Sequence, residues 1–345
     1  MDRAEPIDFP FDQYQRYRLT AELLTALNGG ALPSRILDVG GLSGDENRGW
    51  QRPLAEFLPA AAVTVLDRAV PPIAGYVAGD GRRLPFSDRA FFAAVSADVL
   101  EHVPREGRPA FIDELLRVSD RFVVLTAPIY RPATVQAERM LLEYVRRLLG
   151  AEHRQLREHL DQTLPRTDEV EEIFAGRGLP CVRFDSGYLP DWLMLMMIKH
   201  QLLALPDGAR LNTLLDRYLN LSRYEAHQRA PGYRQVFVAA VDPADGERLR
   251  AAVDRVVPAS PAPAGPNLDD LLEIQLLMGL DLAVTGREVD SRDRRIADLE
   301  REVARLKTAG DDREHRLQVI EYHFDRLRRL LPWRIWKRLR RSGQG

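Results

Sequence analysis

The 345-residue sequence has little cysteine, no signal-like leader and no long apolar run. Cys181 is the only cysteine, which excludes an internal disulfide framework and a zinc site built from several thiolates. The amino terminus is polar, and the most apolar stretch, residues 192–205, is interrupted by Lys199 and His200. A membrane-spanning helix needs about 20 apolar residues. Together these absences predict a cytoplasmic protein.

The chain as a whole also has no large excess of positive or negative charge. The net charge is −2 and hydrophobic residues make up 45% of the sequence. A balanced charge gives no overall field that would attract nucleic acid. The apolar fraction is ordinary for a soluble protein with a substantial core.

Short apolar runs alternate with helical patterns in the first half of the chain. Strands are predicted at Ile36–Val39, Val63–Leu66, Ala93–Ser96 and Phe122–Thr126, and helices at about 14–28, 50–57 and 109–118. Buried strands separated by helices indicate βαβ units and a parallel sheet. Two later strands, "PCVRFDSG" and "YRQVFVAAV", flank a helical insertion at about 189–230. The pattern predicts an α/β protein with a doubly wound, Rossmann-like sheet.

The domain organisation changes after this α/β domain, which we place at 1–245. Residues 246–268 contain a Pro/Ala-rich segment that is typical of a linker. Region 269–330 is helical, and from Ile296 its apolar residues recur at steps of three and four. This spacing predicts a coiled coil, and hence a homo-oligomer. The alternative is a single solvated helix.

The C-terminal tail, 331–345, continues a basic segment. Between Arg326 and Arg341 there are eight Lys or Arg residues and no acid, with Trp333 and Trp336 among them. Basic residues with interfacial tryptophans favour an anionic membrane surface, so a peripheral position at the inner face of a membrane is expected. The alternatives are a solubilising helix end or a protein contact. Nucleic acid is the least favoured partner.

A ligand-binding loop is predicted where the first strand ends. Asp38 is followed by Gly40, Gly41 and Gly44, and ligands of open α/β sheets bind at this edge. The dinucleotide fingerprint G-x-G-x-x-G requires a glycine where the chain has Leu42. A pyrophosphate would also be repelled by Asp38. An acid at this point suits a ligand that carries an ammonium group and a positive sulfur.

Further acids follow along the chain. Asp67 ends the second strand and can accept hydrogen bonds from both hydroxyls of a ribose. Asp80 precedes Gly81 and can accept one from an adenine amine, although Asp-Gly is also ordinary turn chemistry. Likewise, Asp38 can simply cap a turn, and Asp67 can be a surface acid.

Four motifs occur in a familiar order. "ILDVGGLSG", "VTVLD", "GDGRRLPF" and "AAVSADVLEHVP" resemble class I S-adenosylmethionine-dependent methyltransferases, in particular the small-molecule branch with a "DVLEHVP" motif. The resemblance implies a seven-stranded sheet and S-adenosylmethionine as cofactor. The cofactor-binding residues that it implies are Asp38, Gly40, Gly41, Gly44, Asp67, Asp80, Gly81 and Ser96. Leu42 and Phe92 depart from the family's pattern.

Two histidines are candidates for the general base of a methyl transfer to a hydroxyl. His102 follows the fourth strand, and His159 lies in "EHRQLREHLDQTLP". We favour His159; the alternatives are a solvated helix face for His159 and an ordinary helix start for His102. No cluster of metal ligands stands out in the sequence, so no metal is expected.

The segment around His159 resembles bacterial methyltransferases associated with surface-polysaccharide biosynthesis. Together with the basic tail, it predicts O-methylation of a sugar of a cell-surface polysaccharide or of its lipid-linked precursor. The acceptor would therefore be a glycan or another small molecule. The alternatives are a catalytically weak methyltransferase-like scaffold and a methyltransferase acting on a lipid or quinone.

Overall fold

The computed structural model describes residues 6–257, apart from 46–48, 69–72, 151 and 206–207. The predicted coiled coil (269–330), the basic tail (331–345) and residues 258–268 of the predicted linker lie outside the described residues. Oligomerisation and membrane binding through these segments stay predictions.

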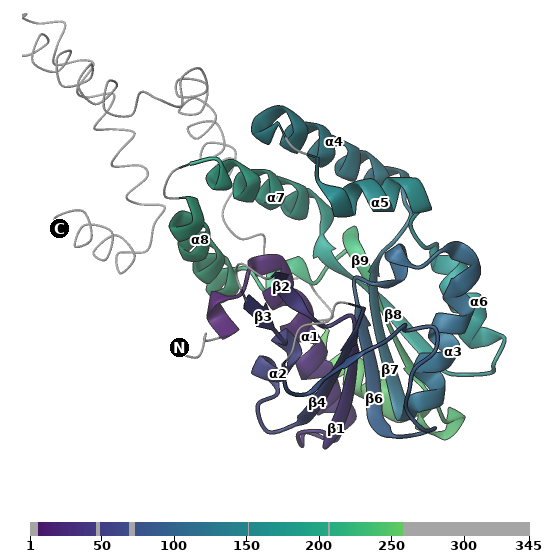
Figure 1. Ribbon diagram of the computed structural model, residues 1–345. Helices are drawn as coiled ribbons and strands as arrows, with labels where there is room; N and C mark the ends of the chain where they lie inside the picture. Colours follow the sequence, from purple (N-terminus) through teal and green to yellow (C-terminus); the bar gives the residue numbers. More distant parts are fainter. Residues whose placement is uncertain (1–5, 46–48, 69–72, 151, 206–207, 258–345) are drawn as a thin grey trace, which may run out of the picture. The chain divides into compact units, whose positions relative to one another are not determined.

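A seven-stranded sheet forms the centre of the described part, in the order β5-β4-β1-β6-β7-β9-β8 (Figure 1). The strands are β1 (Arg35–Val39), β4 (Ala62–Asp67), β5 (Tyr76–Ala78), β6 (Phe91–Ala97), β7 (Ser119–Pro128), β8 (Cys181–Tyr188) and β9 (Gly232–Ala240). The first five strands in this order are parallel, and β9 runs antiparallel to both β7 and β8. The predicted Rossmann-like α/β fold is confirmed.

Helices cover both faces of the sheet because its strands carry apolar side chains on both sides. In β1, Ile36 belongs to one apolar cluster, and Leu37 and Val39 belong to the other. The first cluster includes α1 (Phe11–Leu27), α2 (Pro53–Phe57) and α9 (Gly246–Val256), and the second includes α3 (Arg108–Val118) and α6 (Thr167–Ala175). The result is a three-layer arrangement, as expected for a parallel sheet.

Three helices lie over one end of the sheet in Figure 1 and form a helical cap: α4 (Pro132–Leu149), α5 (Arg154–Gln162) and α7 (Leu189–Leu203). They pack together through an apolar cluster that includes Leu141, Leu156 and Trp192. Helix α7, with α8 (Gly208–Ser222), fills the predicted insertion. None of the described helices is both long and apolar enough to cross a bilayer.

The segment after the glycine loop differs from the prediction of a helix at 50–57. Residues Ser43–Asp45 (β2) and Gly49–Gln51 (β3) form an antiparallel hairpin, and α2 begins only at Pro53. Gly44 and Gly49 both have positive φ, and a Cβ on Gly44 would lie 2.0 Å from the Gly49 carbonyl oxygen. Only glycine tolerates this pairing. No helix N-terminus therefore follows the loop directly.

The boundary that we predicted at residue 245 is also wrong. Residues 246–256 of the predicted linker form α9, whose Leu249, Ala252 and Val253 are buried in the cluster on the α1 side of the sheet. The pattern "ERLRAAVDRV" has helical apolar spacing, and burial against α1 stabilises it as part of the sheet-covering layer. The α/β domain thus extends at least to Val256.

Candidate functional site

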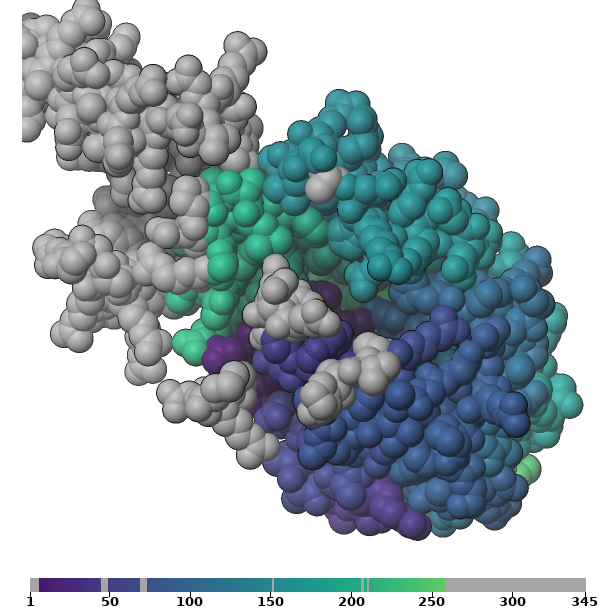
Figure 2. All heavy atoms as spheres, viewed as in Figure 1, coloured from purple at the N-terminus to yellow at the C-terminus, as the bar shows by residue number. Residues whose placement is uncertain are grey.

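Two adjoining cavities open at the carboxyl ends of β1, β4 and β6. The first has a volume of about 430 Å³ and the second of about 330 Å³. They share the lining residues Gly40, Leu42, Asp98, His102 and Gln155. A hollow is visible in Figure 2 between the teal helices of the cap and the blue part of the chain below them. Ligands of open α/β sheets bind at this edge.

Four of the predicted cofactor residues line the first cavity: Gly40, Asp67, Asp80 and Gly81. Asp67 lies at the end of β4, where its Oδ1 accepts a 2.6 Å hydrogen bond from the Arg68 backbone N–H. The Arg82 side chain donates to both oxygens of Asp80, at 3.1 Å and 2.7 Å. These hydrogen bonds hold the pKa of Asp80 far below its usual range. Any ligand amine therefore shares Asp80 with an arginine.

Asp38 lies beneath the loop rather than in a cavity wall. Its side chain is fully buried, and neither carboxylate oxygen has a hydrogen-bond partner among the described residues. A Cβ on Gly41 would lie 1.9 Å from Oδ2 of Asp38, so the loop rests directly on the carboxyl group. Burial raises the pKa of Asp38 to about 7. Ser96 is likewise buried and lines neither cavity.

The raised pKa of Asp38 predicts a pH-dependent stability. The folded pKa of Asp38 is about 7, whereas its ordinary value is 3.8, so folding favours the protonated acid. The stability that this protonation contributes is complete below the unfolded pKa and is lost as the pH rises through 7. Asp38→Asn should remove this loss and raise the free energy of unfolding at pH 8 by about 2–4 kcal/mol relative to wild type. Denaturant titrations at pH 5 and pH 8 check this, and equal pH dependence in both proteins contradicts it.

The rest of the glycine loop separates the two cavities. Gly40 has φ +80°, and a Cβ there would lie 2.2 Å from the Val99 side chain. Gly44 lines the second cavity. Leu42 lines both cavities and packs against the cluster on the α1 side of the sheet. The leucine that departs from the glycine pattern is therefore a wall of the cleft.

A charged cluster that the sequence analysis missed lies where the cavities meet. Asp98, directly after β6, pairs with Arg16 from α1 and with Arg234 from β9. Arg234 donates to the two carboxylate oxygens at 2.8 Å and 2.7 Å. Asp98 has φ +56°, which is uncommon for a non-glycine residue. An acid immediately after a buried strand was the available signal, but its partners come from distant segments.

His159 is held by a buried hydrogen-bond network in the second cavity. Its Nδ1 lies 2.8 Å from Oε1 of Glu138 on α4, and the Tyr233 hydroxyl donates to the same oxygen at 2.7 Å. Glu138 is completely buried, and His159 is only 7% exposed. The prediction that His159 lies at the site is thus consistent with the structure, whereas the solvated-face alternative is not. Glu138 and Tyr233 were not identified from the sequence.

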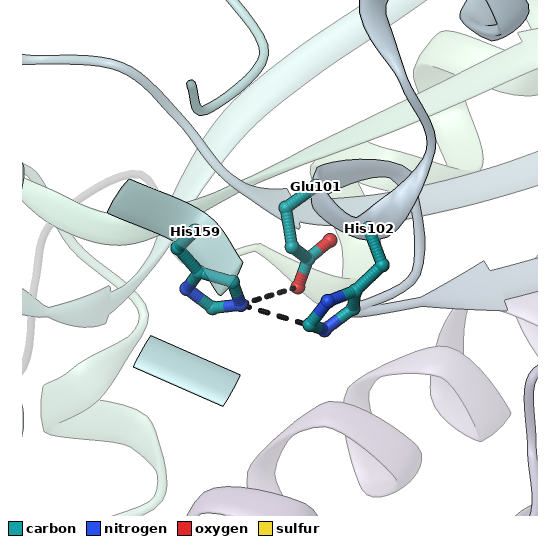
Figure 3. Close-up of side chains that lie close together, drawn as sticks. All are labelled: Glu101, His102 and His159. Carbon is teal, nitrogen blue, oxygen red and sulfur yellow. Dashed lines mark hydrogen bonds and ion pairs between the residues drawn. The ribbon is translucent and has the colours of Figure 1, made fainter. Parts of the chain in front are cut away.

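Two further side chains point at His159 (Figure 3). His102 Nε2 lies 3.4 Å from His159 Nε2, and Oε1 of Glu101 lies 3.9 Å from the same nitrogen. Glu101 is 1% exposed, and its Oε2 has no hydrogen-bond partner among the described residues. The spacing of residues in the sequence does not reveal this group, because His159 is far along the chain from Glu101 and His102. The fold brings all three together.

Comparisons with known proteins give structural neighbours only. No protein-family model and no curated protein matches the chain. The YcgJ protein from Bacillus subtilis is 12% identical, with 65% of this chain and 97% of that chain covered and a TM-score of 0.37. The plantazolicin methyltransferase BpumL, in complex with a triazolic desmethylPZN analog and SAH, is 11% identical over 67% and 85%, with a TM-score of 0.42. Phosphoethanolamine N-methyltransferase 2 from Haemonchus contortus, in complex with S-adenosyl-L-methionine, is 16% identical over 66% and 52%, with a TM-score of 0.40.

Proposed function

We propose that the protein is an S-adenosylmethionine-dependent methyltransferase. One observation carries the proposal: a glycine loop rests on the buried carboxyl group of Asp38, and Gly40 of that loop lines a cavity together with Asp67. A cationic ligand bound above the loop would stabilise the buried carboxyl group beneath it, because a positive charge nearby favours its ionised form. The residues therefore fit a ligand that combines a ribose with an ammonium and a sulfonium group.

Each cavity would bind a different part of the proposed ligand. The first has the volume and the acids for the nucleoside, with Asp67 on the ribose hydroxyls and Gly81 and Phe111 beside the base. The second contains the polar and ionisable side chains, including Arg16, His159 and Tyr233. The methionine part would extend past Gly40 towards the second cavity, which would also receive the acceptor.

The proposed reaction is methyl transfer to a hydroxyl group. The acceptor oxygen forms a bond to the methyl carbon, the carbon–sulfur bond breaks, and sulfur keeps the electron pair. The protein aligns the reactants and provides a group for the hydroxyl proton. His159 is that group in the metal-free protein, since Glu138 holds Nδ1 and leaves Nε2 towards Glu101 and His102.

For the acceptor we propose a sugar of a cell-surface polysaccharide or of its lipid-linked precursor. Two features support this acceptor. The segment around His159 resembles bacterial methyltransferases associated with surface-polysaccharide biosynthesis, and the second cavity has a suitable wall. There, Trp192 and Tyr233 stack on each other with ring centroids 3.6 Å apart and are only 5% and 3% exposed, and they line the cavity together with polar side chains such as Arg16 and Gln155, which can hydrogen-bond sugar hydroxyls. Deleting the gene should remove one methyl group from the surface glycan. A methyl group missing from a lipid or quinone instead would select the alternative acceptor class.

Calorimetric titration with S-adenosylmethionine tests the function. We expect micromolar binding to the wild-type protein, and binding at least tenfold weaker to Asp67→Ala, since a charged hydrogen bond contributes about 1.5–3 kcal/mol. Asp88→Ala is the control, because Asp88 is 75% exposed and pairs with Arg117 away from the cavities. Absence of binding to the wild-type protein would contradict the proposal and favour a scaffold without a cofactor.

A further inference from the structure

The cluster of Glu101, His102 and His159 has the composition of a metal site. One donor atom from each residue lies within 4.8 Å of the others. Glu101 is 1% exposed and its Oε2 has no hydrogen-bond partner among the described residues. Leaving a buried carboxylate oxygen unsatisfied costs free energy unless a cation or donor neutralises it. The other oxygen of the same carboxylate, Oε1, is the one that faces His159, at 3.9 Å from its Nε2.

Both imidazoles have a carboxylate at the nitrogen that faces away from the cluster. His159 Nδ1 contacts Glu138 at 2.8 Å, and His102 Nδ1 lies 3.1 Å from Oε2 of Glu158, although not in hydrogen-bond geometry. Histidines that bind metals usually donate their other N–H to such a group, which fixes the tautomer and leaves a lone pair for the metal. Glu138 and Glu158 favour the tautomers with the proton on Nδ1.

In these tautomers two lone pairs face each other, because the Nε2 atoms are 3.4 Å apart. A contact of this kind repels unless a positive charge lies between the nitrogens. Two nitrogens bound tetrahedrally at about 2.0–2.1 Å are separated by about 3.3–3.4 Å. The observed separation therefore matches two imidazole ligands of one ion. The Glu101 oxygen lies 3.9 Å from His159 Nε2, and all three donor atoms lie within 4.8 Å of one another, so Glu101 needs to move towards the two nitrogens by roughly 1 Å to complete three ligands.

From this geometry we propose that Glu101, His102 and His159 bind one divalent transition-metal ion, with Zn²⁺ the best-suited ion. Two imidazoles and a carboxylate favour zinc and its neighbours, whereas Mg²⁺ and Ca²⁺ prefer oxygen ligands. Three protein ligands leave a fourth position open. His102 and His159 line the second cavity, so the open position is available to an acceptor hydroxyl.

The inference deepens the proposed function and rests on it for the role of the ion. Nε2 of His159 cannot hold a cation and accept a proton at the same time. A bound ion would supply Lewis-acid chemistry that lowers the pKa of an acceptor hydroxyl, and the hydroxyl proton would then pass to solvent rather than to His159. The acceptor class is then a hydroxyl compound rather than an amine.

Zn²⁺ titration of metal-stripped, full-length protein tests the site without S-adenosylmethionine. We expect one ion per chain in the wild type, and loss of that ion in Glu101→Gln and in His159→Gln. Glu138→Gln should still bind one ion, about 10–100-fold more weakly, because it removes only the carboxylate behind His159. His153→Asn is the matched control: His153 lines the same cavity and caps α5, and asparagine retains the cap. Circular dichroism of each variant confirms folding.

Wild-type protein that takes up no stoichiometric Zn²⁺, or one ion that persists in both Glu101→Gln and His159→Gln, overturns the metal site. Neither result bears on whether the protein binds S-adenosylmethionine, because the calorimetric titration measures that binding separately. Conversely, a chain that binds Zn²⁺ at these residues but no S-adenosylmethionine retains the metal site and loses the proposed function.

Discussion

Gly41→Ala is expected to abolish measurable binding of S-adenosylmethionine. The new Cβ would lie 1.9 Å from Oδ2 of Asp38, and a carboxyl group buried on all sides has little room to move away. Either Asp38 or the loop must shift, and overpacking of this kind costs about 1–3 kcal/mol of stability. The same shift moves Gly40 and Leu42, which line both cavities. We therefore expect an affinity loss of at least about 100-fold, measured by calorimetry.

Gly246→Ala is the matched control for this change. Gly246 begins α9 and has an ordinary negative φ. A Cβ at this position would lie 3.3 Å from the nearest atom, which belongs to the Pro180 side chain. Gly246 lines neither cavity, so the Gly246→Ala protein should bind the cofactor as tightly as the wild type. If Gly41→Ala binds as tightly as Gly246→Ala, the loop does not hold the cofactor in the way we propose.

The second large effect concerns stability. Asp98→Asn should lower the free energy of unfolding by about 3–5 kcal/mol, because it leaves two arginines without their counter-ion in a largely buried place. The side chains of Arg16 and Arg234 are 12% and 4% exposed, and both pair with Asp98. Denaturant unfolding at neutral pH measures the loss. Cofactor affinity should also fall, since Asp98 lines both cavities.

Glu143→Gln provides the control for Asp98. Glu143 also pairs with two arginines, Arg146 and Arg147, but these side chains are 42%, 62% and 76% exposed. Exposed ion pairs contribute about 0–1 kcal/mol, so this variant should unfold close to the wild type. Similar losses in Asp98→Asn and Glu143→Gln would show that burial does not strengthen the Asp98 cluster.

The sheet and its loop were predictable from the sequence because their signals are local. Apolar runs located the strands, and Asp38 with Gly40 and Gly41 marked the edge where the cavities lie. Local signals did not predict the strands β2 and β3, where we expected a helix from residue 50, or the helix α9, where we expected a linker. The pairing of β2 with β3 depends on Gly44, and α9 depends on burial against α1.

The cluster around His159 was only partly predictable, because its members are joined by tertiary contacts. His102 and His159 were identified as separate candidates, and nothing in the spacing placed their Nε2 atoms 3.4 Å apart. Glu138 lies within an amphipathic helix, where its buried position is visible only once α4 packs on α5 and β9. Asp98 required partners from α1 and β9. Such contacts arise from the fold rather than from neighbouring residues.

A crystal structure of the protein with S-adenosylhomocysteine would locate the cofactor within the two cavities. We expect the ribose on Asp67, the base beside Gly81 and Phe111, and the sulfur past Gly40, facing the second cavity with His159. A nucleoside in any other place, or a sulfur that faces away from the second cavity, would rule out the proposed cofactor site.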